Sequence, residues 1–128
     1  MDKAVLVAVE IDLEAGRRLI SSLAASNVTV SAALWNLDVA AEQWHLMLAS
    51  PLRDEAGPLE TYETVLGHLR RLGMCQLTLG NVTVRSPREP LVQALRKTFA
   101  DYEGEPGWLH GVSLHGVYIE HAYLYVAK

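Results

Sequence analysis

Histidines are the residues of this chain whose grouping most suggests chemistry. Three of the five lie near the C-terminus, at His110, His115 and His121, beside Glu120. Imidazole nitrogens ligate zinc and transfer protons near neutral pH. On one extended strand His115 and His121 would be about 20 Å apart, whereas a zinc ion needs each ligand nitrogen about 2 Å away. We therefore predict no metal site and no cofactor, and keep His115, Glu120 and His121 as candidates for a hydrolase-type proton-transfer site.

Carboxylate pairs and catalytic motifs give a weaker signal. Asp12 and Glu14 fall in the first turn of a predicted helix, where negative charge stabilises the helix dipole. Asp38 and Glu42 flank a predicted turn. The sequence has no phosphate-binding glycine loop, no metalloprotease helix motif, no nucleophile elbow and no paired C-x-x-C. The missing motifs do not exclude an enzyme whose site is assembled from scattered residues. A non-enzymatic protein is the leading hypothesis, and the His–Glu hydrolase is the alternative.

The elements that must position these residues alternate between strand and helix patterns along the chain. An apolar run at Ala4–Ile11 predicts a buried strand rather than a signal peptide. Apolar residues at helical spacing then predict a helix from Leu13 that ends at Asn27. Alternating residues at 28–37 and 43–50 predict an antiparallel hairpin.

The second half of the chain continues the pattern. A helix is predicted from Gly57-Pro58 to Gly73, because Pro suits the first helical position and Gly suits the position after the last. A strand segment follows at 76–85, and a third helix begins at either Ser86-Pro87 or Glu89-Pro90. The end of the chain, 112–126, is strand-like, with Gly111 and Gly116 as bend points.

This order predicts one α/β domain over residues 1–128, an α+β sandwich. We expect a mixed sheet of about five strands with three helices, and a ferredoxin-like split βαβ start. At 128 residues one core is enough to hold such a domain together.

The alternation predicts one functional feature, a sheet face rich in aromatic and histidine side chains. In the hairpin, Trp35, His45 and Met47 lie on the less aliphatic face. In the last strand, His121, Tyr123 and Tyr125 lie on the corresponding face. If all the helices cover the opposite face, these six residues form an exposed aromatic patch of the kind that binds partners. The alternative is that the third helix or the loop around Trp108 covers them.

Composition limits the partners and the compartment. The net charge is −4, and the basic groups lie scattered on predicted helices, with His68 expected on an exposed face. Nucleic-acid binding, which needs clustered cations, is therefore disfavoured, and a nucleic-acid accessory factor is only a third hypothesis. Cys75 is the single cysteine, which fits a reducing, cytoplasmic location. No apolar stretch has the length of a membrane span.

The segment Gly116–Tyr125, together with Ala32–Trp35 and Leu48–Pro51, resembles short, uncharacterised bacterial proteins. The resemblance implies a small bacterial cytoplasmic protein and transfers no catalytic residue. Taken together, the sequence predicts a non-enzymatic protein-binding or regulatory module. It would act as a homodimer or other homo-oligomer, or as a subunit with a protein partner, through the sheet face.

Overall fold

Three helices and five strands make up the described part of the chain. The structure is a computed structural model, and it describes residues 13–38, 40–73, 77, 80–99 and 102–127. The helices are α2 (Leu13–Ala25), α3 (Leu52–Leu72) and α4 (Pro90–Thr98). The strands are β1 (Ala32–Asp38), β2 (Gln43–Ala49), β3 (Val82–Arg85), β4 (Tyr102–Leu114) and β5 (Val117–Ala127).

The strands form one mixed sheet in the order β3-β2-β1-β5-β4. The β2–β3 pair is parallel, and the other three neighbouring pairs are antiparallel. The predicted α+β class, with a mixed five-stranded sheet and three helices, is confirmed. The ferredoxin-like start depends on the strand expected at 4–11, which lies outside the described residues, as does Cys75.

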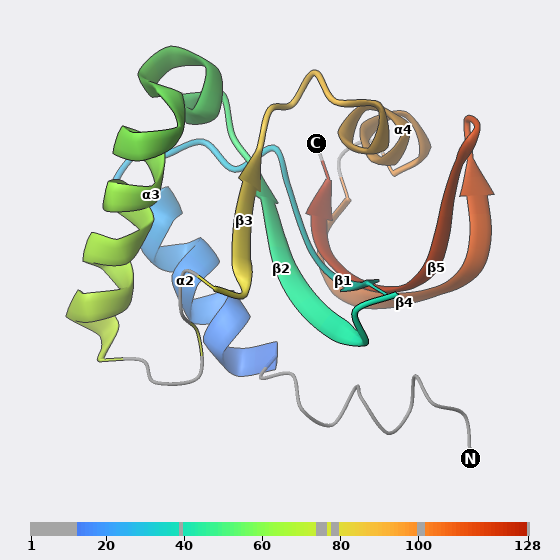
Figure 1. Cartoon of the computed structure of the whole chain (residues 1–128), viewed down its shortest axis with the longest axis horizontal. Coiled ribbons are helices and arrows are strands. Elements are labelled where there is room, and N and C mark those ends of the chain that lie inside the picture. Colours follow the sequence, from blue (N-terminus) through green and yellow to red (C-terminus); the bar gives the residue numbers. More distant parts are fainter. Residues whose placement is uncertain (1–12, 39, 74–76, 78–79, 100–101, 128) are drawn as a thin grey trace.

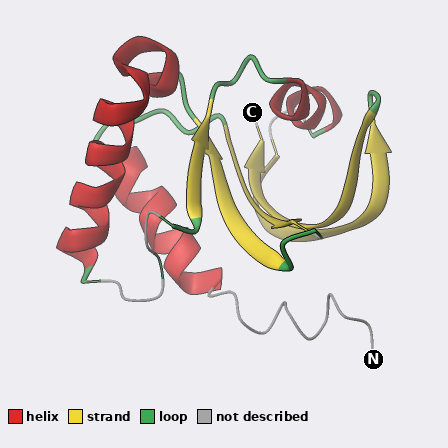
Figure 2. Cartoon of the chain, viewed as in Figure 1, coloured by secondary structure: helices red, strands yellow, loops and turns green. Residues whose placement is uncertain are grey.

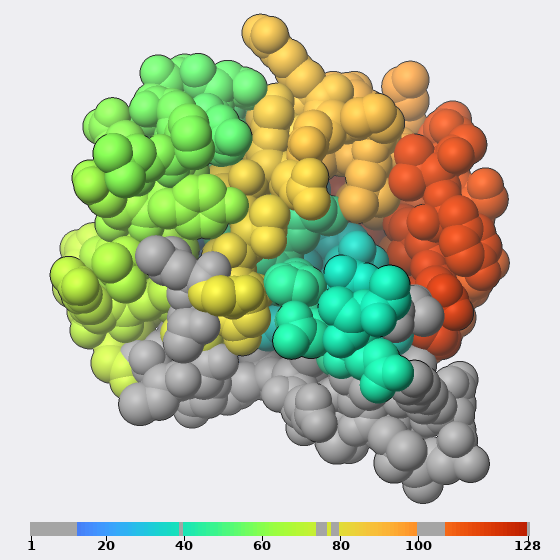
Figure 3. All heavy atoms as spheres, viewed as in Figure 1, coloured from blue at the N-terminus to red at the C-terminus, as the bar shows by residue number. Residues whose placement is uncertain are grey.

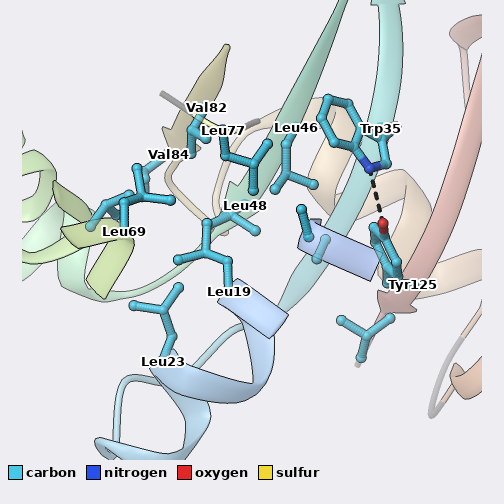
Figure 4. Close-up of a cluster of buried hydrophobic side chains, with 14 of the residues drawn as sticks. Leu19, Leu23, Trp35, Leu46, Leu48, Leu69, Leu77, Val82, Val84 and Tyr125 are labelled. Atoms are coloured by element: carbon cyan, nitrogen blue, oxygen red, sulfur yellow. Dashed lines mark hydrogen bonds between the residues drawn. The ribbon is translucent and has the colours of Figure 1, made fainter. Parts of the chain in front are cut away.

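The sheet curls, and different helices cover its two faces. α2 and α3 lie on one side of the sheet, and α4 lies inside the curl, near the raised β4–β5 hairpin (Figures 1 and 2). The larger core cluster joins α2 and α3 to the sheet through Leu19, Leu23, Leu46 and Leu48, among others (Figure 4). A smaller cluster joins α4 to the opposite face through Leu95.

Helix boundaries follow from local chemistry, with two corrections. α3 begins at Leu52, five residues before the predicted start, and is kinked at Gly57, whose φ of 81° and ψ of 173° are not helical. The kink arises because the residue before a proline avoids the helical region, and Pro58 follows. Gly73 ends the helix in the left-handed conformation, as predicted. α4 begins at Pro90, which selects the second of the two predicted starts.

The expectation of an exposed aromatic sheet face is wrong. Trp35, Tyr123 and Tyr125 are buried in the larger core cluster, under α2 and α3. Met47 is buried on the other face, in the α4 cluster. These residues are buried because helices pack on both faces of the sheet. They also do not share one face, because the register of β1 on β2 places Trp35 opposite Leu46. Residues opposite each other share a face, so Trp35 points away from Met47.

The described helices include none whose length and hydropathy would let it cross a membrane.

Candidate functional site

A cleft of about 470 Å³ opens on the sheet face opposite α2 and α3. Figure 3 shows a hollow on the face of the molecule between β2, β3 and β5. The buried Met47 and the exposed ring of Tyr118 are among its apolar lining. Six polar or charged side chains also line the cleft: Asn36, Asp38, His45, Thr83, Arg85 and Glu120.

Strand register brings these polar side chains together from four strands. Asn36 of β1 pairs with His45 of β2, and Met47 of β2 pairs with Thr83 of β3. Directly opposed residues lie on the same face, about 4.5–5.5 Å apart at Cβ. Residues two positions further along a strand share that face as well, which brings in Asp38 and Arg85. The cleft is therefore built on sheet positions rather than on loops.

The charged side chains that line the cleft are two carboxylates and one arginine. Arg85 forms an ion pair with Glu89 at 3.2 Å, so its charge is already partly matched outside the cleft. Asp38 accepts a hydrogen bond from the backbone N–H of Ala41 at 3.2 Å. Within the described residues, neither Asp38 nor Glu120 forms an ion pair. Among the described residues, the cleft thus presents two carboxylates that form no ion pair, and one arginine whose charge is shared with Glu89.

The histidines and Glu120 predicted as a proton-transfer site are not brought together. Glu120 lines the cleft. His121 belongs to a different group, in which its Nδ1 lies 2.9 Å from Nδ1 of His110, beside Trp108. His115 lies in the tight turn between β4 and β5, with φ of 47°. Adjacent residues of a strand point to opposite faces, which explains why Glu120 and His121 separate.

No protein-family model, curated protein or solved structure is significantly similar to this chain.

Two residues of the predicted contact surface, His45 and Met47, belong to this cleft instead. His45 is half-buried, and no hydrogen bond among the described residues links it to a carboxylate. A general base needs its partner within hydrogen-bond reach. The polar side chains of the cleft can hydrogen-bond or pair with a ligand.

Asn36, Thr83 and Arg85 were missed at the level of sequence. The pairing register of β1, β2 and β3 would have identified them, because it places each of them on the same sheet face as Met47. Alternation within one strand sorts residues into two sets but does not say which sets of neighbouring strands share a face.

His68 was expected to be exposed and is instead buried between α2 and α3. Its Nδ1 lies 2.6 Å from the Ser22 hydroxyl oxygen. Burial, and then the nearby Arg71 charge, lower the pKa of His68 below its ordinary value. The signal was present, because His68 follows Val65 by three residues on the buried stripe of α3. Its role is to pack the two helices.

A second cavity, of about 720 Å³, lies between α2, the 27–31 segment and the end of β5. Its cationic lining residues are Arg17 and Arg96, and Arg17 pairs with Glu14 at 3.2 Å. Much of the remaining lining is apolar or comes from an exposed loop, as at Ile20 and Val28. Rigid strands position polar groups more accurately than loops do, so the β-sheet cleft is the stronger candidate.

Proposed function

We propose that this protein is a binding module that holds a small, positively charged organic ligand, such as an amine, in the β-sheet cleft. The observation that carries the proposal is the pair of carboxylates, Asp38 and Glu120, on a cleft that also presents the ring of Tyr118. The cleft volume of about 470 Å³ falls in the range of known small-molecule sites.

Charge selects the class of ligand. Arg85 also lines the cleft, and its ion pair with Glu89 reduces its attraction for an anionic ligand. An ammonium group placed near Asp38 or Glu120 gains Coulomb attraction that an anion of the same size would lose. Tyr118 is 65% exposed, so its ring face is open to a cation. Asn36 and Thr83 add hydrogen-bonding groups that orient the remainder of the ligand.

The test compares a cation with an anion of the same shape. Benzylamine and benzoate are titrated into the ¹⁵N-labelled chain, and backbone amide shifts are followed by NMR. Benzylamine is expected to shift amides of β1, β3 and β5 around the cleft, and benzoate is not. An exposed charge interaction is worth about 0.5–1 kcal/mol, so Glu120→Gln and Asp38→Asn should each weaken benzylamine binding about two- to fivefold.

Glu63 supplies the matched control, because it is an exposed glutamate of α3 that lies outside the cleft. Glu63→Gln makes the same change in net charge as Glu120→Gln and should leave the affinity unchanged. Equal weakening by both substitutions, or amide shifts that map to the cavity at Arg17 instead, would show that the proposal is wrong.

The second candidate is a homodimer or a complex with a protein partner, and one observation favours it. Trp108 of β4 is 43% exposed at the edge of an aromatic group that includes Tyr123 and Trp44. Exposed tryptophan is typical of interface centres. Light scattering on the purified chain checks the homodimer. A dimer that Trp108→Ser converts to monomer supports it, and a parent chain that is monomeric at millimolar concentration contradicts it.

We also propose a cytoplasmic location, which the single cysteine supports. The net charge of −4 and the carboxylates of the cleft do not favour a nucleic-acid partner.

A further inference from the structure

Two histidines face each other across the last two strands, on the side of the hairpin away from the cleft. His110 of β4 is the register partner of His121 of β5. Their Nδ1 atoms are 2.9 Å apart, and the ring planes meet at 73° with centroids 5.1 Å apart. The contact is a hydrogen bond, in which one Nδ1 donates its proton and the other accepts it.

The separation of the two nitrogens is close to what a metal ion requires. Two nitrogens that each lie about 2.05 Å from one ion are about 2.9 Å apart at a right angle and about 3.3 Å apart at the tetrahedral angle. The observed 2.9 Å spacing between His110 and His121 corresponds to the first of these. The two nitrogens can therefore keep about their present spacing, while each ring turns so that its Nδ1 lone pair points to an ion beside the line that joins them.

We propose that His110 and His121 form a binding site for a divalent transition-metal ion of the Cu²⁺, Ni²⁺ or Zn²⁺ class. The proton that the two Nδ1 atoms now share moves through solvent to Nε2 of its own ring. Both rings are then neutral, and both Nδ1 lone pairs point to the ion. Imidazole suits these three metals, and Cu²⁺ binds most tightly in the usual order of stability.

The surroundings of the pair place an aromatic ring beside one of the two histidines. The indole of Trp108 stacks on the His110 ring, with centroids 6.2 Å apart and an interplanar angle of 12°. Trp108 in turn packs edge-on against the buried Tyr123, with centroids 4.8 Å apart. A ligand whose orientation is held by its neighbours loses less conformational freedom on binding a metal.

The proposed site is open. Across the described residues, no group of three or more histidine, cysteine or acidic side chains is placed to share one ion. His110 is exposed, so water completes the coordination. A two-histidine site of this kind should bind with micromolar affinity, far weaker than a four-ligand structural zinc site. It lies apart from the cleft, so its failure would leave the amine-binding proposal intact.

The test is a titration of the tag-free full chain with Cu²⁺, followed by calorimetry and by tryptophan fluorescence. One ion per chain should bind with a dissociation constant of roughly 1–100 μM, the range expected when two ligands replace four. Bound Cu²⁺ quenches a nearby indole, so the fluorescence should fall. Trp108→Phe should remove the greater part of that quenching and change the calorimetric affinity less than threefold.

The variants separate this site from general copper binding. His110→Gln and His121→Gln should each weaken binding at least tenfold, because each removes one of the two ligands. His115→Gln is the matched control, because His115 lies in the turn of the same hairpin and outside the pair. It should bind as the parent does. Equal affinity in His110→Gln and the parent, or an equal loss in His115→Gln, would overturn the proposal. A ¹⁵N imidazole shift of both histidines with Zn²⁺ gives a second readout that does not depend on copper.

Discussion

Replacement of Gly16 by alanine is expected to destabilise the protein, although glycine-to-alanine changes inside helices usually stabilise. Gly16 lies in α2, over the end of β5. A Cβ at this position would lie 2.5 Å from the Tyr125 hydroxyl oxygen and 3.1 Å from Nε1 of Trp35. That hydroxyl accepts the Trp35 indole N–H at 2.9 Å and donates to the Leu13 carbonyl at 2.7 Å, as Figure 4 shows for the first bond. Tyr125 therefore cannot move aside without losing a bond.

The magnitude follows from three contributions. Alanine gains about 1 kcal/mol over glycine in a helix interior. Forcing extra volume into a packed core costs about 1–3 kcal/mol. Losing one buried hydrogen bond of Tyr125 costs about 1 kcal/mol more. The free energy of unfolding of Gly16→Ala should therefore fall by about 1–3 kcal/mol.

Gly67 of α3 is the matched control, because a Cβ there would meet no atom within 4 Å. Gly67→Ala should raise the free energy of unfolding by about 0.5–1 kcal/mol. Urea denaturation followed by circular dichroism measures both changes. For a chain of this size, 1 kcal/mol also moves Tm by roughly 3–5 °C. If both substitutions stabilise the protein, the close approach of α2 to Tyr125 is wrong.

Two further predictions test buried polar groups. Tyr125→Phe removes the acceptor of the buried indole N–H of Trp35. The free energy of unfolding, measured by urea denaturation, should therefore fall by about 1–3 kcal/mol. An unchanged denaturation midpoint would contradict this hydrogen bond. The pKa of His68 is lowered in the folded state, so the unfolded chain binds more protons as the pH falls below about 6.5. The stability that the neutral His68 contributes is thus present above that pH and is lost as the pH falls. Denaturation midpoints measured between pH 7.5 and 5 should fall less in His68→Gln than in the parent chain, and parallel slopes would show that His68 is not responsible.

Helices were the part of the fold that local chemistry predicted best. Gly16 and Leu23 of the stripe expected in α2 lie on its buried side, because a 3.6-residue period leaves one face that can pack on a sheet. Ala24 of that stripe is exposed, and Leu19, which the expectation did not include, is buried. Gly73 ends α3 for an equally local reason, since its φ of 65° suits glycine. The antiparallel β1–β2 hairpin was also confirmed, because the two alternating runs are close in sequence.

Strand faces were predicted poorly because they depend on register. Within β1 the alternation was right: Leu34 and Trp35 do point to opposite sides. The error came between strands, where Trp35 is opposite Leu46 rather than beside Met47. A shift of one residue in the pairing exchanges every side chain of a strand between the two faces. The apolar content of both faces gave no means of choosing, because helices cover both.

The positions of the two proposed sites also depend on a bend in β4, which the alternation of apolar and polar residues does not predict. On β4 the residues packed toward α4 are Leu109 and then Val112 and Leu114, so the inward positions change from odd to even. The change spans Gly111, whose φ of 56° is a left-handed conformation that glycine adopts at little cost. The pairing of His110 with His121 before the bend, and of Val112 with Ile119 after it, keeps the same register throughout. The bend therefore turns the faces of both strands together. It allows the tip of the hairpin to curl toward α4 while His110 and His121 stay on the outer side. A regular strand through position 111 would put Leu109 and Val112 on opposite faces, and the hairpin could not close over α4 as it does.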